Sequence, residues 1–359
     1  MVRIVSFGAV VLGAAMALLL ASCTSDSTTT TPPTSTDSNA VAYSFVVLGC
    51  NRVDKADTNF TSNPSTANLS QFNRSMTEIA SLNPKPDYLF FAGDMVLGYT
   101  KDSTQLASEL GAWRALYEAS AAKAAGIQLV AVLGNHESQN DKKIATAAAE
   151  RQWLSIMSPY ILGSNGPGIG GADSLQTDQS KLTYSFNFKD AHFVVVNTDP
   201  VGRDWRPASH WIASDIAAAK TSGSKHIFAI GHKPAYAWDY QLGAGSANDG
   251  LGQYPENRDV LWNALDNNRA EAFLCAHNHV HTILRPTNKT WEIIAGNGGS
   301  KLETGVTTAE QNYGYTVVQV LKSGKVIEKS YGRNFSGYLD PSPASSYPTT
   351  VRDSQIISW

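Results

Sequence analysis

The segment IQLVAVLGNHE, residues 127–137, joins an apolar run to a glycine and a group of polar side chains. An uninterrupted run of valine, leucine and isoleucine predicts a strand that is buried on both faces. Gly134 allows the backbone to turn sharply where the strand ends, and Asn135 and His136 follow directly. The segment therefore predicts a site at the carboxyl end of a buried strand, where amide and imidazole groups could bind a metal or act in catalysis.

The same arrangement recurs along the chain. Apolar runs rich in valine, isoleucine and phenylalanine alternate with longer segments of helical periodicity, which predicts a mixed α/β fold. Polar residues follow several of the runs directly, so they should gather at one edge of the sheets. Predicted strands cover residues 43–49, 87–93, 127–134, 192–198, 225–231, 271–276, 291–296 and 315–320, and predicted helices cover residues 69–82, 104–125, 145–156, 208–220 and 258–268.

Length and charge narrow the class of protein. A chain of 359 residues, 42% hydrophobic and 16% charged, can bury one large core or two modest ones. The formal net charge of -3, without a run of lysine or arginine, gives no electrostatic footprint for nucleic acid. We therefore expect no nucleic-acid binding.

Residues 1–22 have the pattern of a signal peptide. Arg3 supplies a positive charge, and the apolar run from Ala9 to Leu20 is too short for a typical membrane span. The run leads into LASC, residues 20–23, which resembles the lipobox of bacterial lipoproteins, in which the cysteine becomes the lipidated first residue. Cys23 is therefore the expected lipidation site, and ordinary secretion with a free thiol is the alternative.

Residues 23–40 are rich in threonine, serine and proline and show no hydrophobic periodicity. Such a segment buries too little apolar surface to offset the entropy of ordering, so we expect a disordered tether. By the sorting rule of enterobacterial lipoproteins, Thr24 after the cysteine favours the outer membrane, facing the periplasm or the exterior. A globular domain should then cover residues 41–332, and a surface arm rich in serine, proline and tyrosine should cover 333–359.

Five short motifs follow predicted strands in order along the chain. They read GCNR (49–52), GDMVLGY (93–99), GNHE (134–137), GHKP (231–234) and AHNH (276–279). This set resembles the calcineurin-like metallophosphoesterase superfamily, whose pattern is DxH, GDxxD, GNHE, a single histidine and GHxH. The resemblance runs from Val41 to about Gly332 and implies a four-layer α/β/β/α sandwich.

The resemblance also implies roles for the residues that match the motifs. Asp94 would bridge two divalent metal ions, which together activate a nucleophile and neutralise the charge of a phosphoester. His279 would bind the first metal, and His136 would stabilise the transferring phosphoryl group or protonate the leaving oxygen. Oxygen and nitrogen ligands suit zinc, manganese or iron. The second metal would be held by Asp94 with Asn135, His232 and His277.

The first-metal site departs from the family pattern. Cys50 stands where the family has an aspartate; it could ligate as a thiolate or form a disulfide with Cys275. Arg52 stands where the family has a histidine and cannot ligate, because its guanidinium stays protonated, but it could hold phosphate oxygens. Leu97 occupies the place of the ligating tyrosine of purple acid phosphatases, for which Tyr99 is a weak substitute. We therefore expect one or two metal ions per chain.

Three further residues are candidates for substrate contacts. Tyr236 and Trp238 lie in a glycine-rich segment after GHKP that could stack a ring, although packing of these aromatics on the domain is the alternative. His281 lies on the same side as His279 if the segment stays extended. We expect it to make a substrate contact or to support a ligand.

These features together predict a metal-dependent phosphoesterase. It would hydrolyse a phosphomonoester or phosphodiester, in a small molecule or a polymer, by attack of a metal-bound hydroxide. Lipid on the N-terminal cysteine would anchor it in the membrane of the bacterial cell envelope. The altered first-metal site leaves a second hypothesis open, a non-catalytic lipoprotein that binds a metal or another ligand.

Overall fold

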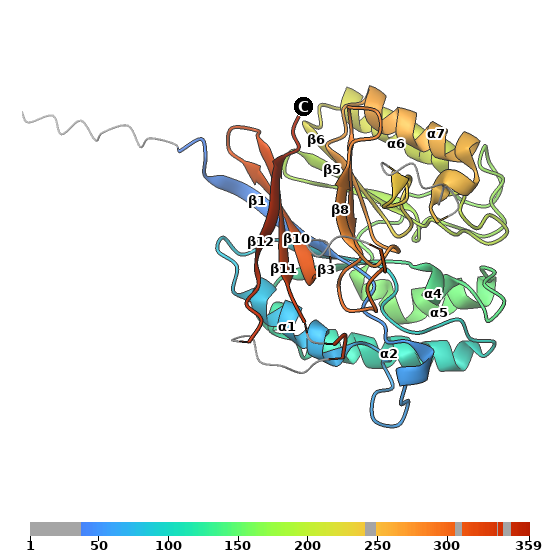
Figure 1. Ribbon diagram of the computed structural model, residues 1–359. Coiled ribbons are helices and arrows are strands. Elements are labelled where there is room, and N and C mark those ends of the chain that lie inside the picture. Colours follow the sequence, from blue (N-terminus) through green and yellow to red (C-terminus); the bar gives the residue numbers. More distant parts are fainter. Residues whose placement is uncertain (1–36, 241–248, 306–310, 336, 340–345) are drawn as a thin grey trace, which may run out of the picture. The chain divides into compact units, whose positions relative to one another are not determined.

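The computed structural model describes residues 37–240, 249–305, 311–335, 337–339 and 346–359 (Figure 1). The chain divides into two units, Met1–Asp37 and Ser38–Trp359, and every helix and strand described below belongs to the second unit. The expected signal peptide, most of the expected tether and Cys23 lie outside the described residues. Every helix in the described part of the chain is too short or too polar to cross a bilayer.

The first sheet has six strands in the order β12-β11-β10-β1-β2-β3. The strands β1, β2 and β3 pair in parallel, as expected for apolar runs separated by helices, and β10, β11 and β12 extend the sheet by antiparallel pairing. The strands are β1 (Val41–Leu48), β2 (Tyr88–Ala92), β3 (Gln128–Val132), β10 (Tyr313–Leu321), β11 (Val326–Arg333) and β12 (Thr350–Ile356).

The second sheet has six strands in the order β4-β5-β6-β7-β9-β8. Its four central strands pair in parallel, and the edge strands β4 and β8 pair antiparallel to their neighbours. The strands are β4 (Tyr184–Phe188), β5 (Ala191–Val196), β6 (His226–Gly231), β7 (Ala272–Cys275), β8 (His281–Leu284) and β9 (Trp291–Ala295).

Helices cover the outer faces of both sheets (Figure 1). Phe72 of α1 and Trp113 of α2 belong to a buried core against the first sheet, and Ile212 of α6 and Trp262 of α7 belong to one against the second sheet. A third core fills the space between the sheets. This arrangement confirms the predicted four-layer α/β/β/α sandwich. The helices are α1 (Leu69–Ala80), α2 (Ser103–Glu118), α3 (Ala121–Ala124), α4 (Asn135–Ser138), α5 (Ala147–Met157), α6 (Ser209–Thr221) and α7 (Pro255–Asn267).

The glycines that begin GDMVLGY and GNHE are needed because the loops after β2 and β3 pack backbone against backbone. Gly93 has a φ of +81°, and a Cβ built on it would lie 2.6 Å from the Gly134 Cα and 2.6 Å from His232 Nδ1. A side chain at this position would push the strand ends apart. The two glycines therefore let three motifs from both sheets meet at one place.

The structure differs from the surface arm expected over residues 333–359. Residues 350–356 form β12, which pairs with β11 and extends the first sheet. Arg333 is buried, and its guanidinium donates to the Gln71 side chain at 2.6 and 2.8 Å. The strand was missed because most of its side chains are exposed, so its sequence lacks the apolar pattern of a buried strand.

Candidate metal centre and active site

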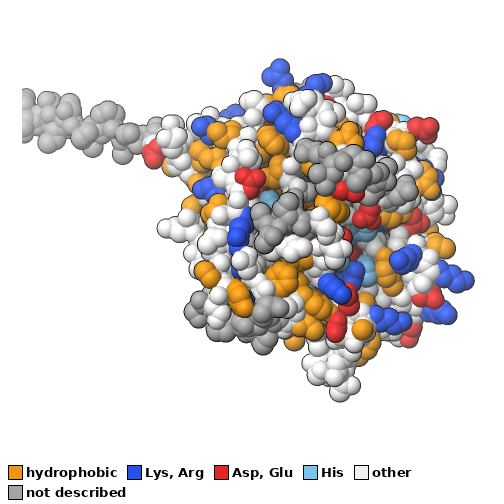
Figure 2. Space-filling model, in the orientation of Figure 1, with side chains coloured by type: hydrophobic (Ala, Val, Ile, Leu, Met, Phe, Trp, Pro, Cys, Tyr) orange, Lys and Arg blue, Asp and Glu red, His pale blue; other side chains and the backbone are white. Residues whose placement is uncertain are grey.

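The motif residues converge at the carboxyl ends of strands from both sheets. Figure 2 shows histidine side chains at the surface of this face, with acidic and basic side chains around them. Cys50 follows β1, Asp94 follows β2, Asn135 and His136 begin α4 after β3, His232 follows β6, and His277 and His279 follow β7.

Four side chains expected to hold the second metal lie in mutual contact. His232 Nε2 lies 2.7 Å from Asn135 Oδ1, 3.1 Å from Asp94 Oδ1 and 3.3 Å from His277 Nδ1. The distance from His277 Nδ1 to Asn135 Oδ1 is 2.9 Å. Asp94, His232 and His277 also form one of the two groups of potential ligands whose atoms all lie within 4.8 Å of one another among the described residues.

The hydrogen bonds of His232 show that these four residues need a cation among them. Its Nδ1 lies 2.7 Å from the Ala92 carbonyl oxygen and donates to it, since a carbonyl only accepts. In neutral His232 the Nε2 lone pair would then face the oxygens of Asn135 and Asp94, which also only accept. A proton or a metal ion resolves this contact. The nitrogen and oxygen donors suit zinc, manganese or iron, so these residues fit the expected metal.

The local charges favour an ionised carboxylate at the centre. Burial opposes ionisation of Asp94, but the imidazoles of His136 and His232 hold the pKa of its carboxyl well below the usual value. Burial also opposes a charge on His232, but the Asp94 carboxylate raises the pKa of that imidazole. Asp94 therefore supplies the negative charge expected of a ligand that bridges two metals.

The glutamate of GNHE holds the loops together. One Glu137 carboxylate oxygen accepts the N–H of Asp94 and of Gly134, each at 3.0 Å, and the other accepts the N–H of Met95 at 2.6 Å. Glu137 is fully buried, which raises the pKa of its carboxyl to about 7. A single side chain thus fixes the loop that carries Asp94 against the start of α4.

Three of the candidate ligands have left-handed backbone conformations. The φ angles are +57° at Cys50, +54° at Asp94 and +63° at His277. Such angles are uncommon for residues other than glycine and concentrate at functional sites. At each of these positions a side chain is kept where glycine would fit the backbone better.

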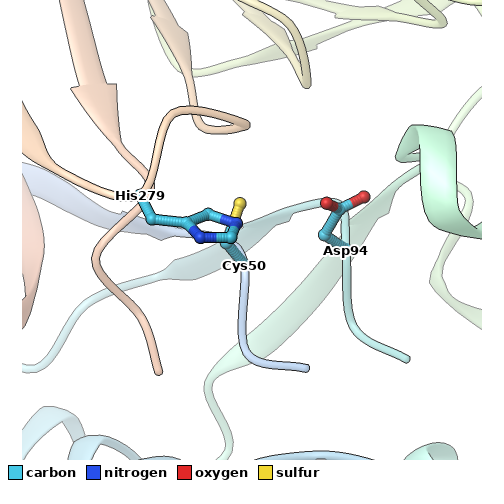
Figure 3. Close-up of side chains that lie close together, drawn as sticks. All are labelled: Cys50, Asp94 and His279. Carbon is cyan, nitrogen blue, oxygen red and sulfur yellow. The ribbon is translucent and has the colours of Figure 1, made fainter. Parts of the chain in front are cut away.

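Cys50, Asp94 and His279 form the second group of ligand atoms within 4.8 Å of one another. Figure 3 shows Cys50 and His279 next to each other, with Asp94 at the end of a neighbouring strand. His279 Nδ1 lies 2.7 Å from the Lys301 carbonyl oxygen, to which it donates, so Nε2 is left to ligate. Cys50 and Cys275 are both buried free thiols, so the alternative of a disulfide between them is wrong for this structure.

The Cys50 thiol is held close to the other ligands. Its Sγ accepts the N–H of His277 at 3.2 Å. Burial raises the pKa of the thiol well above the usual value, and the Asp94 carboxylate adds to this effect. A bound metal would be needed to stabilise the thiolate against burial. With two other ligands in reach, this set fits a metal less completely than the set around His232.

Arg52 lies beside the same group of ligands. Its Nε is 3.9 Å from Asp94 Oδ2, and its Nη1 is 3.5 Å from Asp54 Oδ1. Among the described residues, the buried Nε has no hydrogen-bond partner. The structure therefore places a guanidinium with spare donors next to the incomplete metal site, where phosphate oxygens could accept from it.

His136 lies between the metal ligands and the loop after β2. Its Nδ1 contacts the Leu97 carbonyl oxygen, and its Nε2 lies 3.8 Å from Asp94 Oδ2. The ring packs at a tilt of 40° against the Tyr99 ring, with 3.9 Å between centroids. Burial lowers the pKa of His136 to about 3, although Asp94 opposes this shift. His136 is thus fixed on two sides and is not part of either ligand group.

A cavity of about 930 Å³ opens over the site. Its lining brings together the expected site residues Arg52, Asp94, Asn135, His136, His277 and His279. Lys55, Lys101 and Lys143 also line it, and the Lys101 ammonium pairs with Asp141 at 3.5 Å. Carboxylates line the cavity as well, namely Asp94, Asp102, Asp141, Asp249 and Glu303, so an anionic substrate would depend on direct contact with the basic side chains or with bound metal.

The structure does not bring the three expected substrate contacts to this cavity. Tyr236 is buried against Trp262, with 5.0 Å between ring centroids, and Trp238 packs on the same core, as in the packing alternative. His281 points toward Glu328 of the other sheet, with 3.6 Å between Nε2 and Oε1. Residues 277–280 are bent rather than extended, so alternation did not place His281 beside His279. Residues 241–248 of the segment lie outside the described residues.

Several residues of the site were missed by sequence reasoning. Asp249 Oδ1 lies 3.3 Å from His277 Nε2, and Glu303 Oε1 accepts the N–H of His279 at 3.3 Å. Both come from loops whose course no local pattern predicts, so the sequence carried no signal for them. Lys233 is fully buried, with its Nζ 2.5 Å from Asp199 Oδ1, and only its place in GHKP marked it.

Comparison with solved structures finds the same fold in proteins of low sequence identity, two of which are named as phosphatases. A purple acid phosphatase, PPD1, from yellow lupin (Lupinus luteus) seeds is 15% identical with a TM-score of 0.56, over 89% of this chain and 54% of that chain. PhoD is 14% identical with a TM-score of 0.57, over 89% and 70%. A dimetal phosphatase from Danio rerio is 12% identical with a TM-score of 0.52, over 82% and 97%. This chain thus spans about half the length of the lupin protein.

Sequence comparison adds a family assignment. A search of curated proteins finds no match. A family model described as calcineurin-like phosphoesterase matches residues 56–281, which is more than half of the chain. The matched range contains Asp94, GNHE, GHKP and AHNH, whose side chains the fold brings together. The chain therefore belongs to the calcineurin-like phosphoesterase family.

Proposed function

We propose that this protein is a metal-dependent hydrolase of phosphomonoesters or phosphodiesters. The observation that carries the proposal is the contact of Asp94, Asn135, His232 and His277 through ligand atoms, beneath a cavity that Arg52 and three lysines line together with carboxylates. Bound divalent metals, of which zinc, manganese and iron suit these donors, would activate a water and neutralise phosphoryl oxygens.

The side chains around this set have distinct tasks in the proposed reaction. Asp94, Cys50 and His279 would hold the ion of the first-metal site. Arg52 would donate to phosphoryl oxygens and replace part of the charge that an altered ligand set supplies weakly. His136, held at Nδ1 by Leu97, would use Nε2 to donate to a phosphoryl or leaving oxygen when protonated, a state that burial opposes and that the charges of Asp94 and of a bound phosphoryl group would favour.

The location of the protein is part of the proposal. We infer that lipid on Cys23 anchors the protein to the cell envelope and that the domain works outside the cytoplasm. By the sorting rule, the lipid would be held in the outer membrane. The motif LASC and the polar segment behind it support this placement. The substrate would then be a phosphorylated small molecule or polymer present in that compartment.

Metal analysis combined with activity assays tests the proposal. The purified domain should carry at least one divalent metal per chain and hydrolyse para-nitrophenyl phosphate or its bis-ester. His277→Ala should lose metal and activity together, because it removes a ligand. His136→Ala should lose about 10²–10⁴-fold in turnover, the range of a positioned acid or base, and keep its metal.

His210→Ala is the matched control. The His210 imidazole does not line the cavity, and its Nδ1 lies 3.0 Å from Asp173 Oδ1. Its metal content and turnover should stay at the wild-type level. If the metal-loaded wild type hydrolyses neither class of ester, the proposal is wrong. The alternative is a non-catalytic binding protein, which the replacement of two first-site ligands by Cys50 and Arg52 favours. Absence of hydrolysis would support that alternative.

A further inference from the structure

Tyr99 lies in the site although the family pattern gives it no role. Its hydroxyl contacts the Asn135 amide nitrogen, and its ring packs at a tilt against the His136 ring. Its backbone N–H donates to the His136 carbonyl oxygen at 3.1 Å. Tyr99 also lines the cavity. The residue therefore touches a candidate metal ligand, the candidate acid and the space for the substrate.

The loop after β2 is built to deliver this side chain. Gly98 and Tyr99 have φ angles of +53° and +48°, and a Cβ on Gly98 would lie 1.7 Å from the His136 carbonyl oxygen. Only glycine fits there. The Gly98 N–H donates to Glu109 Oε2 at 2.9 Å, which fixes the turn from the side of α2. A left-handed tyrosine held this way indicates a functional constraint.

The direction of the hydroxyl proton follows from the Asn135 amide. Its Oδ1 faces His232 and His277, so its Nδ2 faces Tyr99. An amide N–H can only donate, so the Tyr99 oxygen accepts and its own proton points elsewhere. In the described part of the chain, this hydroxyl has no other hydrogen-bond partner. The proton is therefore available to a molecule in the cavity.

We propose that Tyr99 is a catalytic hydrogen-bond donor to an oxygen of the transferred phosphoryl group. The inference rests on the proposed function and adds a residue to it. Arg52 would donate from the side of Cys50 and His279, and Tyr99 would donate from the side of Asn135. Donors fixed before the reaction stabilise developing negative charge without reorganisation. A hydroxyl in this place would compensate in part for the positive charge that the altered first-metal site lacks.

Tyr99→Phe tests the inference, because it removes the hydroxyl and keeps the ring against His136. In the metal-loaded protein, binding of inorganic phosphate measured by calorimetry should weaken about 10-fold, and kcat for para-nitrophenyl phosphate should fall about 10²-fold. Metal content should stay at the wild-type level. Tyr254→Phe is the matched control, since that ring lies under Arg206 and does not line the cavity, and it should change neither quantity.

Four outcomes would overturn the inference. Unchanged phosphate affinity in Tyr99→Phe would exclude a hydrogen bond to the phosphoryl group. Loss of metal from that variant would make Tyr99 a metal ligand or a support for Asn135. Loss of a visible charge-transfer band from the iron-loaded variant would make Tyr99 a metal ligand. A wild type that binds no phosphate would leave Tyr99 nothing to donate to. A wild type that binds phosphate without turnover would contradict only the proposed function, and phosphate affinity would still test Tyr99.

Discussion

Cys50 is the residue where this site departs furthest from its family. Its thiol is buried, unbridged and within reach of Asp94 and His279. A soft sulfur ligand favours zinc or iron over manganese, so this one position affects which metal the first site accepts. Because Arg52 replaces a further ligand nearby, the first site should be occupied less fully than the second.

Cys50→Asp should raise metal occupancy of the first site toward one ion per chain, because it restores the carboxylate of the family pattern. Aspartate also tolerates the left-handed backbone at this position better than most residues. Metal analysis of the purified variant measures the change, and phosphoesterase activity should rise with it. Cys275→Ala is the control, because that thiol lies in β7 outside both ligand groups. Unchanged stoichiometry in Cys50→Asp would remove residue 50 from the metal shell.

At the scale of elements, buried carboxylates tie loops to strands. Glu292 of β9 is fully buried and accepts the N–H of Ala235 at 2.5 Å and of Tyr236 at 3.1 Å. It thereby fixes the segment that follows GHKP to the second sheet. Burial raises the pKa of its carboxyl to about 8, although the two backbone donors oppose the shift.

This pKa predicts a stability that falls with rising pH. Between about pH 5 and pH 8 the folded chain keeps a proton on Glu292 that the unfolded chain has lost. The free energy of unfolding should therefore decrease by about 1.4 kcal/mol per pH unit from this group. Glu292→Gln should remove that part of the slope, as urea unfolding at several pH values would measure.

The exposed Glu256 of α7 provides the control variant, Glu256→Gln, whose unfolding should follow the wild-type pH dependence. Parallel pH profiles for the wild type and Glu292→Gln would contradict the prediction. They would show that Glu292 is ionised in the folded chain over this range.

Sequence patterns predicted the continuous apolar strands far better than the short or polar ones. Continuous apolar runs identified β2 and β3 to within a few residues, because burial on both faces leaves a strong signal. The strand β8 has only four residues, and β11 places the polar Glu328 and Ser330 toward the other sheet. Neither offers the apolar pattern on which the prediction depended.

The candidate site shows the same division. Site residues that directly follow a continuous apolar strand, such as Asp94 and His232, were predicted correctly to lie at the site, because the end of the strand fixes their position. Asp249 and Glu303 reach the site from loops, and their positions depend on tertiary packing. His281 failed for a related reason, since residues 277–280 are bent and the side chains of His279 and His281 therefore do not follow strand alternation.

At the scale of the whole molecule, the proposed anchor can be tested separately from the domain. Cys23→Ser should abolish lipid modification and move the full-length protein from the membrane fraction to the soluble fraction. Labelling cells with a radioactive fatty acid, followed by fractionation, measures both effects. Cys275→Ala should still take up label, because that cysteine is buried in the domain. A wild type that takes up no label would contradict lipidation at Cys23.

The left-handed residues of the metal centre also affect how the whole chain folds. Cys50, Asp94 and His277 each cost roughly 1 kcal/mol relative to glycine in the same conformation. Together they oppose folding by a sizeable part of the 5–15 kcal/mol that typically stabilises a domain. A metal that binds only the folded chain offsets this strain by mass action. The same ions that would make the site reactive would therefore act as folding ligands, and metal supply while the chain folds would govern how much folded protein accumulates.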